Sequence, residues 1–219
     1  MADPKQGQAT SPYGPDEFAA AFVVSRETLA RLEAFAALLA KWNPSINLVS
    51  PRDIPDLWRR HVLDSAQLLP LLPHPPPGRQ RRIVDLGSGA GFPGLILAIL
   101  GAGEVHLIES DGRKCAFLAE AIRLTGATAT VHNIRIELVP EKLPSLRADV
   151  IVARGLASLD KLIGFSVPLI EKGGICLFLK GGSLASELTL AEKNWHMQVE
   201  QLPSRTSEAG VILRIGEIS

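Results

Sequence analysis

The stretch IVDLGSGAGFPG at residues 83–94 places four glycines within eight positions, directly after a short apolar run that contains one aspartate. Glycine has no Cβ, so such a segment allows a ligand or another part of the chain to lie against the bare backbone. A strand that leads through a glycine turn into a helix is a common way to bind a ligand at a helix N-terminus. The stretch therefore predicts a strand, a ligand-binding turn and a helix, in that order.

The spacing of the glycines distinguishes three kinds of loop. A dinucleotide-binding loop has the pattern G-x-G-x-x-G, but counting from Gly87 the third glycine position holds Phe92. A P-loop ends in Gly-Lys-Ser or Gly-Lys-Thr, and neither follows. The pattern D/E-x-G-x-G-x-G of S-adenosylmethionine-binding loops is matched throughout by Asp85, Gly87, Gly89 and Gly91. The sequence thus predicts S-adenosylmethionine as cofactor, with Gly87 and Gly89 against it and Asp85 orienting a backbone or ligand amine. A glycine turn that only packs a helix onto a strand is the alternative.

Two later segments supply candidate partners for this cofactor. Glu109 ends an apolar run 22 residues after Gly87, where an acidic side chain at the tip of the second strand binds ribose hydroxyls. Asp111 is expected to cap the following helix, and capping is also the alternative role for Glu109. Ile136 and Glu137, after the third predicted strand, are candidates for contacts with adenine, with a plain surface turn as the alternative.

Composition limits the class of protein. The 219 residues suffice for one domain with an extension, and 23 basic side chains balance 23 acidic ones, so no global field attracts nucleic acid or a membrane. The apolar runs are much shorter than the roughly 20 residues of a membrane span. The N-terminus does not resemble a secretion signal, and two cysteines form neither a disulfide framework nor a zinc cluster. We expect a cytoplasmic protein without a bound metal.

Beyond the glycine turn, short apolar runs alternate with helical patterns. Strands are predicted at 82–87, 104–109, 129–133, 149–154, 175–180, 196–202 and 210–216, and helices at 93–100, 112–124, 157–171 and 183–193. This alternation predicts an α/β fold, a seven-stranded and mostly parallel sheet covered by helices. The last two strands have no helix between them and are therefore expected to be antiparallel.

The part before the glycine turn has a different pattern. Residues 1–24 are polar and predicted to be a flexible tail, and residues 25–72 are predicted to form an N-terminal helical cap. Within the cap, prolines break the helical pattern over 42–53, and a second helix is expected over 54–72. The proline-rich segment 73–82 is predicted to be a linker, and residues 83–219 the cofactor-binding domain.

The segment after the fourth predicted strand narrows the chemistry. Enzymes that methylate exocyclic amino groups of bases carry Asp/Asn-Pro-Pro-Tyr/Phe there, whereas this chain has VARGLAS at 152–158. Enzymes that methylate C5 of a pyrimidine need a cysteine nucleophile. Cys115 lies in a predicted helix and Cys176 within a predicted strand, where each is expected to be a small buried apolar residue. Neither chemistry is therefore expected.

Five stretches stand in order along the chain: WN with INL at 42–48, RHVLDS at 60–65, GFPG at 91–94, RGLAS at 154–158 and LKG at 179–181. Together they resemble the bacterial 16S rRNA (guanine-N7) methyltransferase G family, also called glucose-inhibited division protein B. The resemblance runs from about Leu32 to the C-terminus and implies a Rossmann-like class I methyltransferase fold. It further implies methylation of guanine N7 in 16S rRNA, at guanosine 527 in the 530 loop.

The resemblance also implies site residues. Cofactor contacts fall on four places, which are Gly87, Phe92, Ile136 with Glu137, and Arg154. Arg154 is expected to position cofactor or substrate, with a structural salt bridge as the alternative. Gly155 stands where the family usually has alanine. Because guanine N7 has a free lone pair, no general base is required, and no catalytic residue is assigned.

Basic residues are the candidates for binding RNA. Residues 52–82 contain six arginines and three acids, a local net charge of +3. If the linker folds beside the glycine turn, a phosphate-binding rim around the pocket is expected from Arg59, Arg60, Arg79, Arg81 and Arg82. Ordinary solvated charges are the alternative. The expected partner is 16S rRNA within the 30S subunit or a precursor, and the protein is expected to be a monomer. A small-molecule methyltransferase or a cofactor-binding regulator is the alternative function.

Overall fold

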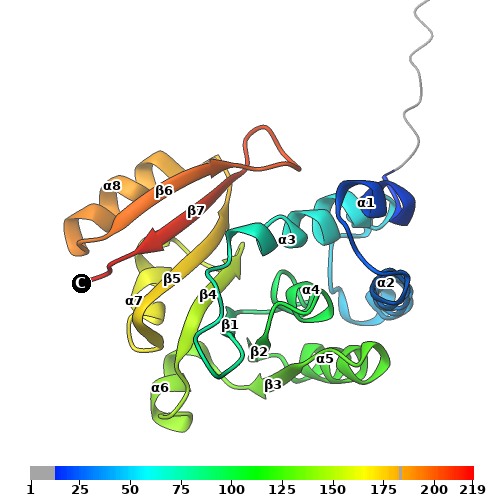
Figure 1. The fold of residues 1–219 in the computed structure, drawn as a ribbon, viewed down its shortest axis with the longest axis horizontal. Coiled ribbons are helices and arrows are strands. Elements are labelled where there is room, and N and C mark those ends of the chain that lie inside the picture. The colour runs from blue at the N-terminus through cyan, green and yellow to red at the C-terminus, as the bar shows by residue number, and fades with distance from the viewer. Residues whose placement is uncertain (1–12, 183) are drawn as a thin grey trace, which may run out of the picture.

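The computed structural model describes residues 13–182 and 184–219, in which helices cover both faces of a central sheet (Figure 1). Within these residues, seven strands follow the order β3-β2-β1-β4-β5-β7-β6 across the sheet. The first five of these are parallel, and β7 is antiparallel to both β5 and β6. The strands are β1 (Arg82–Leu86), β2 (Glu104–Glu109), β3 (Ala129–Asn133), β4 (Ala148–Arg154), β5 (Ile170–Lys180), β6 (Gln198–Pro203) and β7 (Val211–Gly216).

Two hydrophobic clusters pack on the two faces of this sheet, because successive side chains of a strand point to opposite faces. In β1, Ile83 belongs to the cluster beneath α2, α4 and α5, whereas Val84 belongs to the cluster beneath α6, α7 and α8. These helices are α2 (Arg26–Ile46), α4 (Gly94–Ile99), α5 (Gly112–Thr125), α6 (Val139–Lys142), α7 (Leu159–Ser166) and α8 (Leu184–Asn194). The Rossmann-like α/β fold with a mostly parallel sheet is therefore confirmed.

The predicted strands agree with the structure to within a few residues, except at β5. This strand begins at Ile170 rather than at residue 175, and the predicted helix over 157–171 is shorter because α7 ends at Ser166. The register between β4 and β5 shifts near Ala148, and Gly173 has a φ of +80°. The early part of β5 is thus irregular, which hid it from a search for regular alternation.

Part of the stretch 1–24, predicted to be a flexible tail, is helical in the structure. The helix α1 (Pro15–Ala21) buries Phe18, whose side chain is 0% exposed. The Phe18 ring stacks on Phe22 with centroids 5.2 Å apart and lies 5.6 Å from Trp58. The prediction missed this helix because one aromatic anchor in a polar stretch gives no periodic signal. Residues 1–12 lie outside the described residues.

The break predicted over 42–53 begins later in the structure. The helix α2 continues through Pro44 to Ile46, and Asn47 ends it in a left-handed conformation with a φ of +49°. Instead of one helix over 54–72, short helical pieces follow: η1 (Pro51–Asp56), η2 (Trp58–Leu63), α3 (Asp64–Ala66) and η3 (Leu69–Leu71). Proline lacks the N–H that a regular helix needs, so the prolines of η1 and η3 favour short 3₁₀ turns. The piece η2 contains no proline and is a wider π-helical turn.

The helical N-terminal segment shares its core with the sheet domain. The Phe35 ring lies 5.5 Å from Phe92 and 6.1 Å from Phe117, and the Trp42 ring lies 5.8 Å from Phe117. Phe117 belongs to α5, and Phe92 to the glycine turn. Residues 25–72 are therefore packed as part of the main hydrophobic core rather than as a separate cap.

Candidate active site

The turn after β1 is built from glycines with left-handed backbone. Gly87, Gly89 and Gly91 have φ values of +68°, +55° and +94°, a region that residues with a Cβ rarely adopt. A Cβ on Gly87 would lie 2.6 Å from the side chain of Leu156, and a Cβ on Gly91 would lie 2.9 Å from Leu95. These glycines are therefore required by the turn and by the close approach of neighbouring segments.

Asp85 lies beneath this turn. Its side chain is fully buried, and its Oδ2 accepts a hydrogen bond from the Gly94 N–H at 3.1 Å. This bond ties the first residue of α4 to the end of β1. Asp85 is not among the residues that line the neighbouring cleft. Asp85 was predicted to orient either a backbone N–H or a ligand amine, and in the structure it binds the backbone N–H of Gly94.

A cleft of about 500 Å³ opens beyond the carboxyl ends of β1, β2 and β4, where open α/β sheets bind their ligands. Six of the predicted cofactor-binding residues line it, namely Gly87, Gly89, Glu109, Ile136, Glu137 and Arg154. Other lining residues were not predicted, among them Lys114, Leu156, Lys161 and Phe165. No local motif marks them, because they reach the cleft through the packing of α5, α7 and the loop after β4.

Glu109 both shapes the turn and lines the cleft. Its Oε2 accepts the N–H of Gly89 at 2.9 Å, and its Oε1 accepts those of Ser110 and Asp111 at 2.8 Å each. A carboxylate offers about four acceptor positions, so one position remains for a ligand hydroxyl. Asp111 caps α5 as predicted, since its Oδ1 accepts the Arg113 N–H at 2.8 Å.

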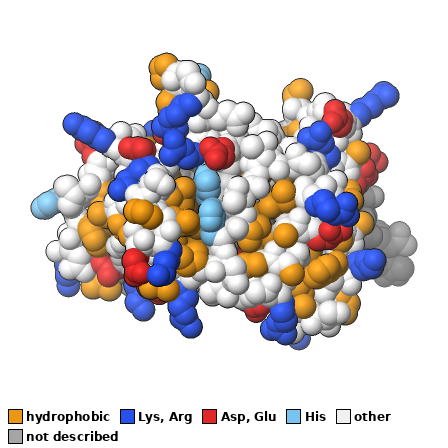
Figure 2. Space-filling model, turned by 90° about the horizontal axis from the view of Figure 1, so that it is seen from below, with side chains coloured by type: hydrophobic (Ala, Val, Ile, Leu, Met, Phe, Trp, Pro, Cys, Tyr) orange, Lys and Arg blue, Asp and Glu red, His pale blue; other side chains and the backbone are white. Residues whose placement is uncertain are grey.

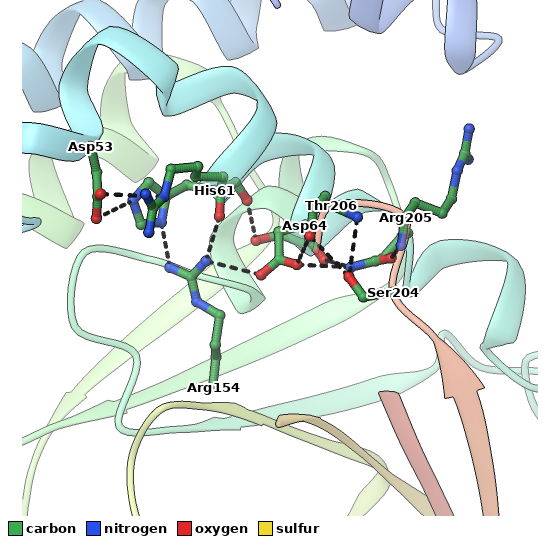
Figure 3. Close-up of polar contacts among 10 residues, drawn as sticks. Asp53, His61, Asp64, Arg154, Ser204, Arg205 and Thr206 are labelled. Atoms are coloured by element: carbon green, nitrogen blue, oxygen red, sulfur yellow. Dashed lines mark hydrogen bonds and ion pairs between the residues drawn. The ribbon is translucent and has the colours of Figure 1, made fainter. Parts of the chain in front are cut away.

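Arg154 ends β4 and reaches the N-terminal helical segment (Figure 3). Its Nη1 donates to the Arg60 carbonyl oxygen and to Asp64 Oδ2, both at 3.1 Å, and its Nη2 donates to His61 Nδ1 at 2.7 Å. The guanidinium carbon also lies 5.0 Å from the centroid of the Phe92 ring. The alternative predicted for Arg154, a structural salt bridge, is therefore present, while the same side chain lines the cleft.

Phe92 lies beneath Arg154 rather than at the surface of the cleft. Its side chain is buried, and its ring stacks on His61 at 4.8 Å and meets Phe35 edge-on at 5.5 Å. It is not among the residues that line the cleft. The N-terminal segment therefore covers the Phe92 ring, and the predicted contact between Phe92 and the cofactor stays a prediction.

The network keeps His61 neutral. Burial, and then the charge of Arg154, lowers the pKa of His61 to about 4. A guanidinium only donates hydrogen bonds, so His61 Nδ1 accepts and Nε2 carries the proton. This Nε2 lies 3.4 Å from Asp53 Oδ2. Neutral imidazole therefore links Asp53 to Arg154 at neutral pH.

Asp64 joins the same network to the turn between β6 and β7 (Figure 3). Its Oδ1 accepts from Thr206 Oγ1 at 2.6 Å and from Gln67 Nε2 at 2.8 Å. Gln67 Oε1 in turn accepts the Arg205 N–H at 2.8 Å. The N-terminal segment, the end of β4 and the β6–β7 turn therefore meet in one set of polar contacts.

The predicted RNA-binding arginines lie in two separate places. Arg59 and Arg60 are exposed on η2, and the carbonyl oxygen of Arg60 accepts from Arg154 at the edge of the cleft. The Arg60 Nε lies 3.2 Å from Asp53 Oδ1. Both arginine side chains are therefore accessible to a polyanion, and the Arg60 backbone lies at the edge of the cleft.

Arg79, Arg81 and Arg82 lie near the amino ends of β1 and β4, at the opposite end of the strands from the cleft. Arg79 forms two hydrogen bonds of 2.7 Å with Asp149, and Arg81 donates to the Pro73 carbonyl oxygen at 2.9 Å. The linker leads into the amino end of β1, whereas the glycine turn leaves its carboxyl end. The predicted rim around the pocket is therefore wrong for these three arginines.

Charge is distributed over the surface in keeping with the net charge of zero. In Figure 2, lysine and arginine side chains are interspersed with carboxylates and apolar side chains on the face shown. Across the described part of the chain, no helix is both long and apolar enough to cross a membrane.

Neither cysteine is placed to act as a nucleophile. Cys115 and Cys176 are both buried and free, and burial raises the pKa of Cys176 to about 12. The thiolate is the reactive form, so neither side chain suits nucleophilic chemistry. Among residues 13–182 and 184–219, no three His, Cys, Asp or Glu side chains are grouped as a metal site.

Asp85 makes the stability of the fold depend on pH. Burial raises the pKa of Asp85 to about 7, from an ordinary value of 3.8. Between these values the folded protein keeps a proton that the unfolded chain releases, so this contribution to stability is present at low pH and is lost as pH rises through about 7. We expect Asp85→Asn, which keeps an acceptor for Gly94 without the charge, to become more stable relative to the parent protein from pH 5 to pH 8.

Urea unfolding of both proteins at the two pH values measures this difference, and the subtraction cancels the opposing contribution of His61. An equal difference in unfolding free energy at pH 5 and pH 8 would show that Asp85 has no such coupling.

Solved structures share this fold. The O-methyltransferase from Bacillus cereus in complex with SAH superposes with a TM-score of 0.59 at 12% sequence identity, over 92% of this chain and 96% of that chain. Pyrococcus horikoshii TYW2 in complex with MeSAdo superposes with a TM-score of 0.54 at 18% identity, over 76% of this chain and 63% of that chain. At such low identities the likeness supports the fold alone, that of class I methyltransferases.

Sequence relatives are much more similar. The family model for rRNA small subunit methyltransferase G (GidB) matches residues 28–210. The ribosomal RNA small subunit methyltransferase G of Rhodospirillum centenum is 57% identical over 203 residues, 93% of this chain and 90% of that protein. The protein of the same name from Paramagnetospirillum magneticum is 52% identical over 206 residues, 94% of this chain and 97% of that protein. The chain belongs to the rRNA small subunit methyltransferase G family.

Proposed function

We propose that this protein transfers a methyl group from S-adenosylmethionine to N7 of a guanine in 16S rRNA, guanosine 527 in the 530 loop, and that it acts as a cytoplasmic monomer on the 30S subunit or a precursor. Membership of the family makes it an S-adenosylmethionine-dependent rRNA methyltransferase. The observation that carries the proposal is the cleft at the carboxyl ends of β1, β2 and β4, in which the glycine turn and Glu109 meet Arg154.

The residues of the cleft fit the cofactor. Gly89 lines the cleft, and a Cβ on it would have only the Gly87 carbonyl oxygen within 4 Å. The space beside the Gly89 backbone is therefore open to a ligand. Glu109 offers its one remaining acceptor position to a ribose hydroxyl, and Ile136 offers an apolar surface to adenine. Lys114 and Lys161, also in the lining, bring positive charge suited to a carboxylate. When bound, S-adenosylmethionine supplies a methyl group on a positively charged sulfur.

The acceptor chemistry asks for positioning rather than for proton removal. Guanine N7 has a free lone pair, so no residue has to act as a base. Arg154, in the cleft lining at the end of β4, has only hydrogen-bond donors and therefore cannot act as a base. Its bonds to His61 and Asp64 hold the guanidinium in one place. The contribution of the chain is therefore to hold the acceptor atom in line at contact distance.

The alternatives are a small-molecule methyltransferase and a cofactor-binding regulator. The relatives reported above are named for rRNA methylation and match nearly the whole chain. The exposed side chains of Arg59 and Arg60 on η2 also suit a polyanion. These observations favour RNA over a metabolite.

The decisive experiment incubates the protein with radiolabelled S-adenosylmethionine and 16S rRNA, either naked or in 30S subunits from a strain that lacks the enzyme. We expect label in the RNA and strand cleavage at a single guanine after borohydride and aniline treatment, which breaks the chain at N7-methylguanine. Label without cleavage would place the methyl group on another atom. Absence of label from both RNA forms would favour the small-molecule alternative.

The cofactor assignment is tested in the loop after β3. We expect Ile136→Trp to fill part of the cleft and to weaken S-adenosylmethionine binding at least about tenfold, a cost of roughly 1.4 kcal/mol, in isothermal titration calorimetry. The matched control is Leu138→Trp, because Leu138 is exposed, two residues away and outside the cleft lining. Equal affinities of the two variants would remove Ile136 from the cofactor site.

The RNA-binding assignment is tested on η2. We expect Arg59→Gln with Arg60→Gln to lower the salt dependence of RNA binding by about 0.7–0.9 per lost phosphate contact, with unchanged cofactor affinity. The control variant, Lys142→Gln with Lys172→Gln, removes the same charge from exposed positions, one in α6 and one near the amino end of β5. Filter binding over a range of salt concentrations measures both. The same salt slope in both variants would exclude η2 from the RNA interface.

A further inference from the structure

A second cavity lies beside the cofactor cleft. It has a volume of about 320 Å³, near the lower limit of small-molecule sites. Its walls come from four parts of the chain: Asp64 of α3, the end of β4, the end of β5, and the turn between β6 and β7. Leu179 and Val211 contribute apolar surface to this cavity, and Ser204 and Ser207 contribute polar groups. This mixture suits a flat heterocycle with polar edges.

The two cavities meet at the end of β4. Arg154 and Gly155 line both of them, the cleft on the side of β1 and the second cavity on the side of β5. Methyl transfer requires the accepting atom to be in contact with the donated group. A base in the second cavity would present its reacting atom at this shared wall.

We infer that the second cavity takes the acceptor guanine, flipped out of the RNA, and that Arg154 reads its O6 atom. This inference rests on the proposed function and adds the place of the base and the residues that select it. Enzymes that act on a base commonly hold it in such a pocket, through hydrogen bonds to its edges.

The donors of Arg154 fit this role. Of the five N–H groups of a guanidinium, three are used by Arg60, Asp64 and His61. Among the described residues, the Nε–H and the second Nη2–H of Arg154 have no acceptor. Guanine carries O6, an acceptor, next to N7, whereas adenine carries an amino group there. With N7 at the shared wall, a permanent donor therefore favours guanine and repels adenine.

The far wall offers acceptors to the other edge of guanine. Its N1–H and 2-amino group are donors, and the cavity there contains the carboxylate of Asp64 and the hydroxyl of Ser207. The hydroxyl oxygen of Ser204, also in this wall, already accepts from Gln67 Nε2 and from the Thr206 N–H. Three acceptor positions of Asp64 are already used, by Arg154, Thr206 and Gln67, and a carboxylate has about four. These bonds also fix the β6–β7 turn in place, so the wall is built before the base arrives.

The first test fills the cavity from its exposed rim. Ala209 lies on the β6–β7 turn and lines the cavity, whereas its neighbour Glu208 is exposed and does not line it. We expect Ala209→Trp to bind S-adenosylmethionine within about twofold of the parent protein but to lose at least about 100-fold in kcat/KM for rRNA methylation. Glu208→Trp should retain both, and circular dichroism confirms that both variants are folded. Normal methylation by Ala209→Trp would overturn the inference.

The second test changes the base. In 30S subunits reconstituted with 2-aminopurine in place of the acceptor guanine, N7 and the 2-amino group are kept, whereas the oxygen at C6 and the proton on N1 are absent. We expect kcat/KM for the parent protein to fall about 10- to 100-fold, the range of one well-formed contact between arginine and guanine. Equal rates on the two bases would overturn the role of Arg154.

Failure of the inference and failure of the proposed function give different results. If the parent protein does not methylate N7 of guanine in rRNA, the proposed function fails. If it does, but the Ala209→Trp variant and the 2-aminopurine substrate react normally, only the acceptor cavity is wrong.

Discussion

Two buried carboxylates hold the turn on which the site depends. Asp85 at the end of β1 accepts the Gly94 N–H, and Glu109 at the end of β2 accepts the Gly89 N–H. Backbone N–H groups that are buried without a partner cost free energy, so these bonds fix the path of the chain from β1 into α4. The turn can then present backbone without side chains to the cleft. Everything proposed for the cofactor relies on that bare surface.

Arg154 connects this turn to the rest of the molecule. Its guanidinium lies over Phe92 and binds His61 and Asp64, so the stretches at 60–65 and 154–158, about 90 residues apart, meet at one point. Both stretches had supported the family resemblance without any indication of contact between them. The N-terminal segment is therefore part of the wall of the site, and neutral His61 allows it to bind a cation without repulsion.

The sequence predicted well what local backbone chemistry dictates. Short apolar runs located the strands, and helical periodicity located the helices between them. The absence of a helix between β6 and β7 indicated that these two strands are antiparallel. The start of β5 was missed because of an irregular register, and α1 because its only buried residue is Phe18. Helix α2 passes through Pro44 although proline disfavours a helix interior, since tertiary packing of its apolar face stabilises it. Such contacts leave no mark in a short window of sequence.

The sequence by itself determined the order of elements, the glycine turn and the acidic residue that follows the second strand, because these depend on short-range patterns of backbone freedom and burial. Only the tertiary structure decided which side chains share a cavity. It placed Arg79 at the amino ends of the strands, away from the cleft. It also buried Phe92 beneath Arg154 and brought the β6–β7 turn to Asp64. The physical reason is that contacts between distant segments follow from the direction of strands and the packing of helices. Those are properties of the whole chain and not of any stretch within it.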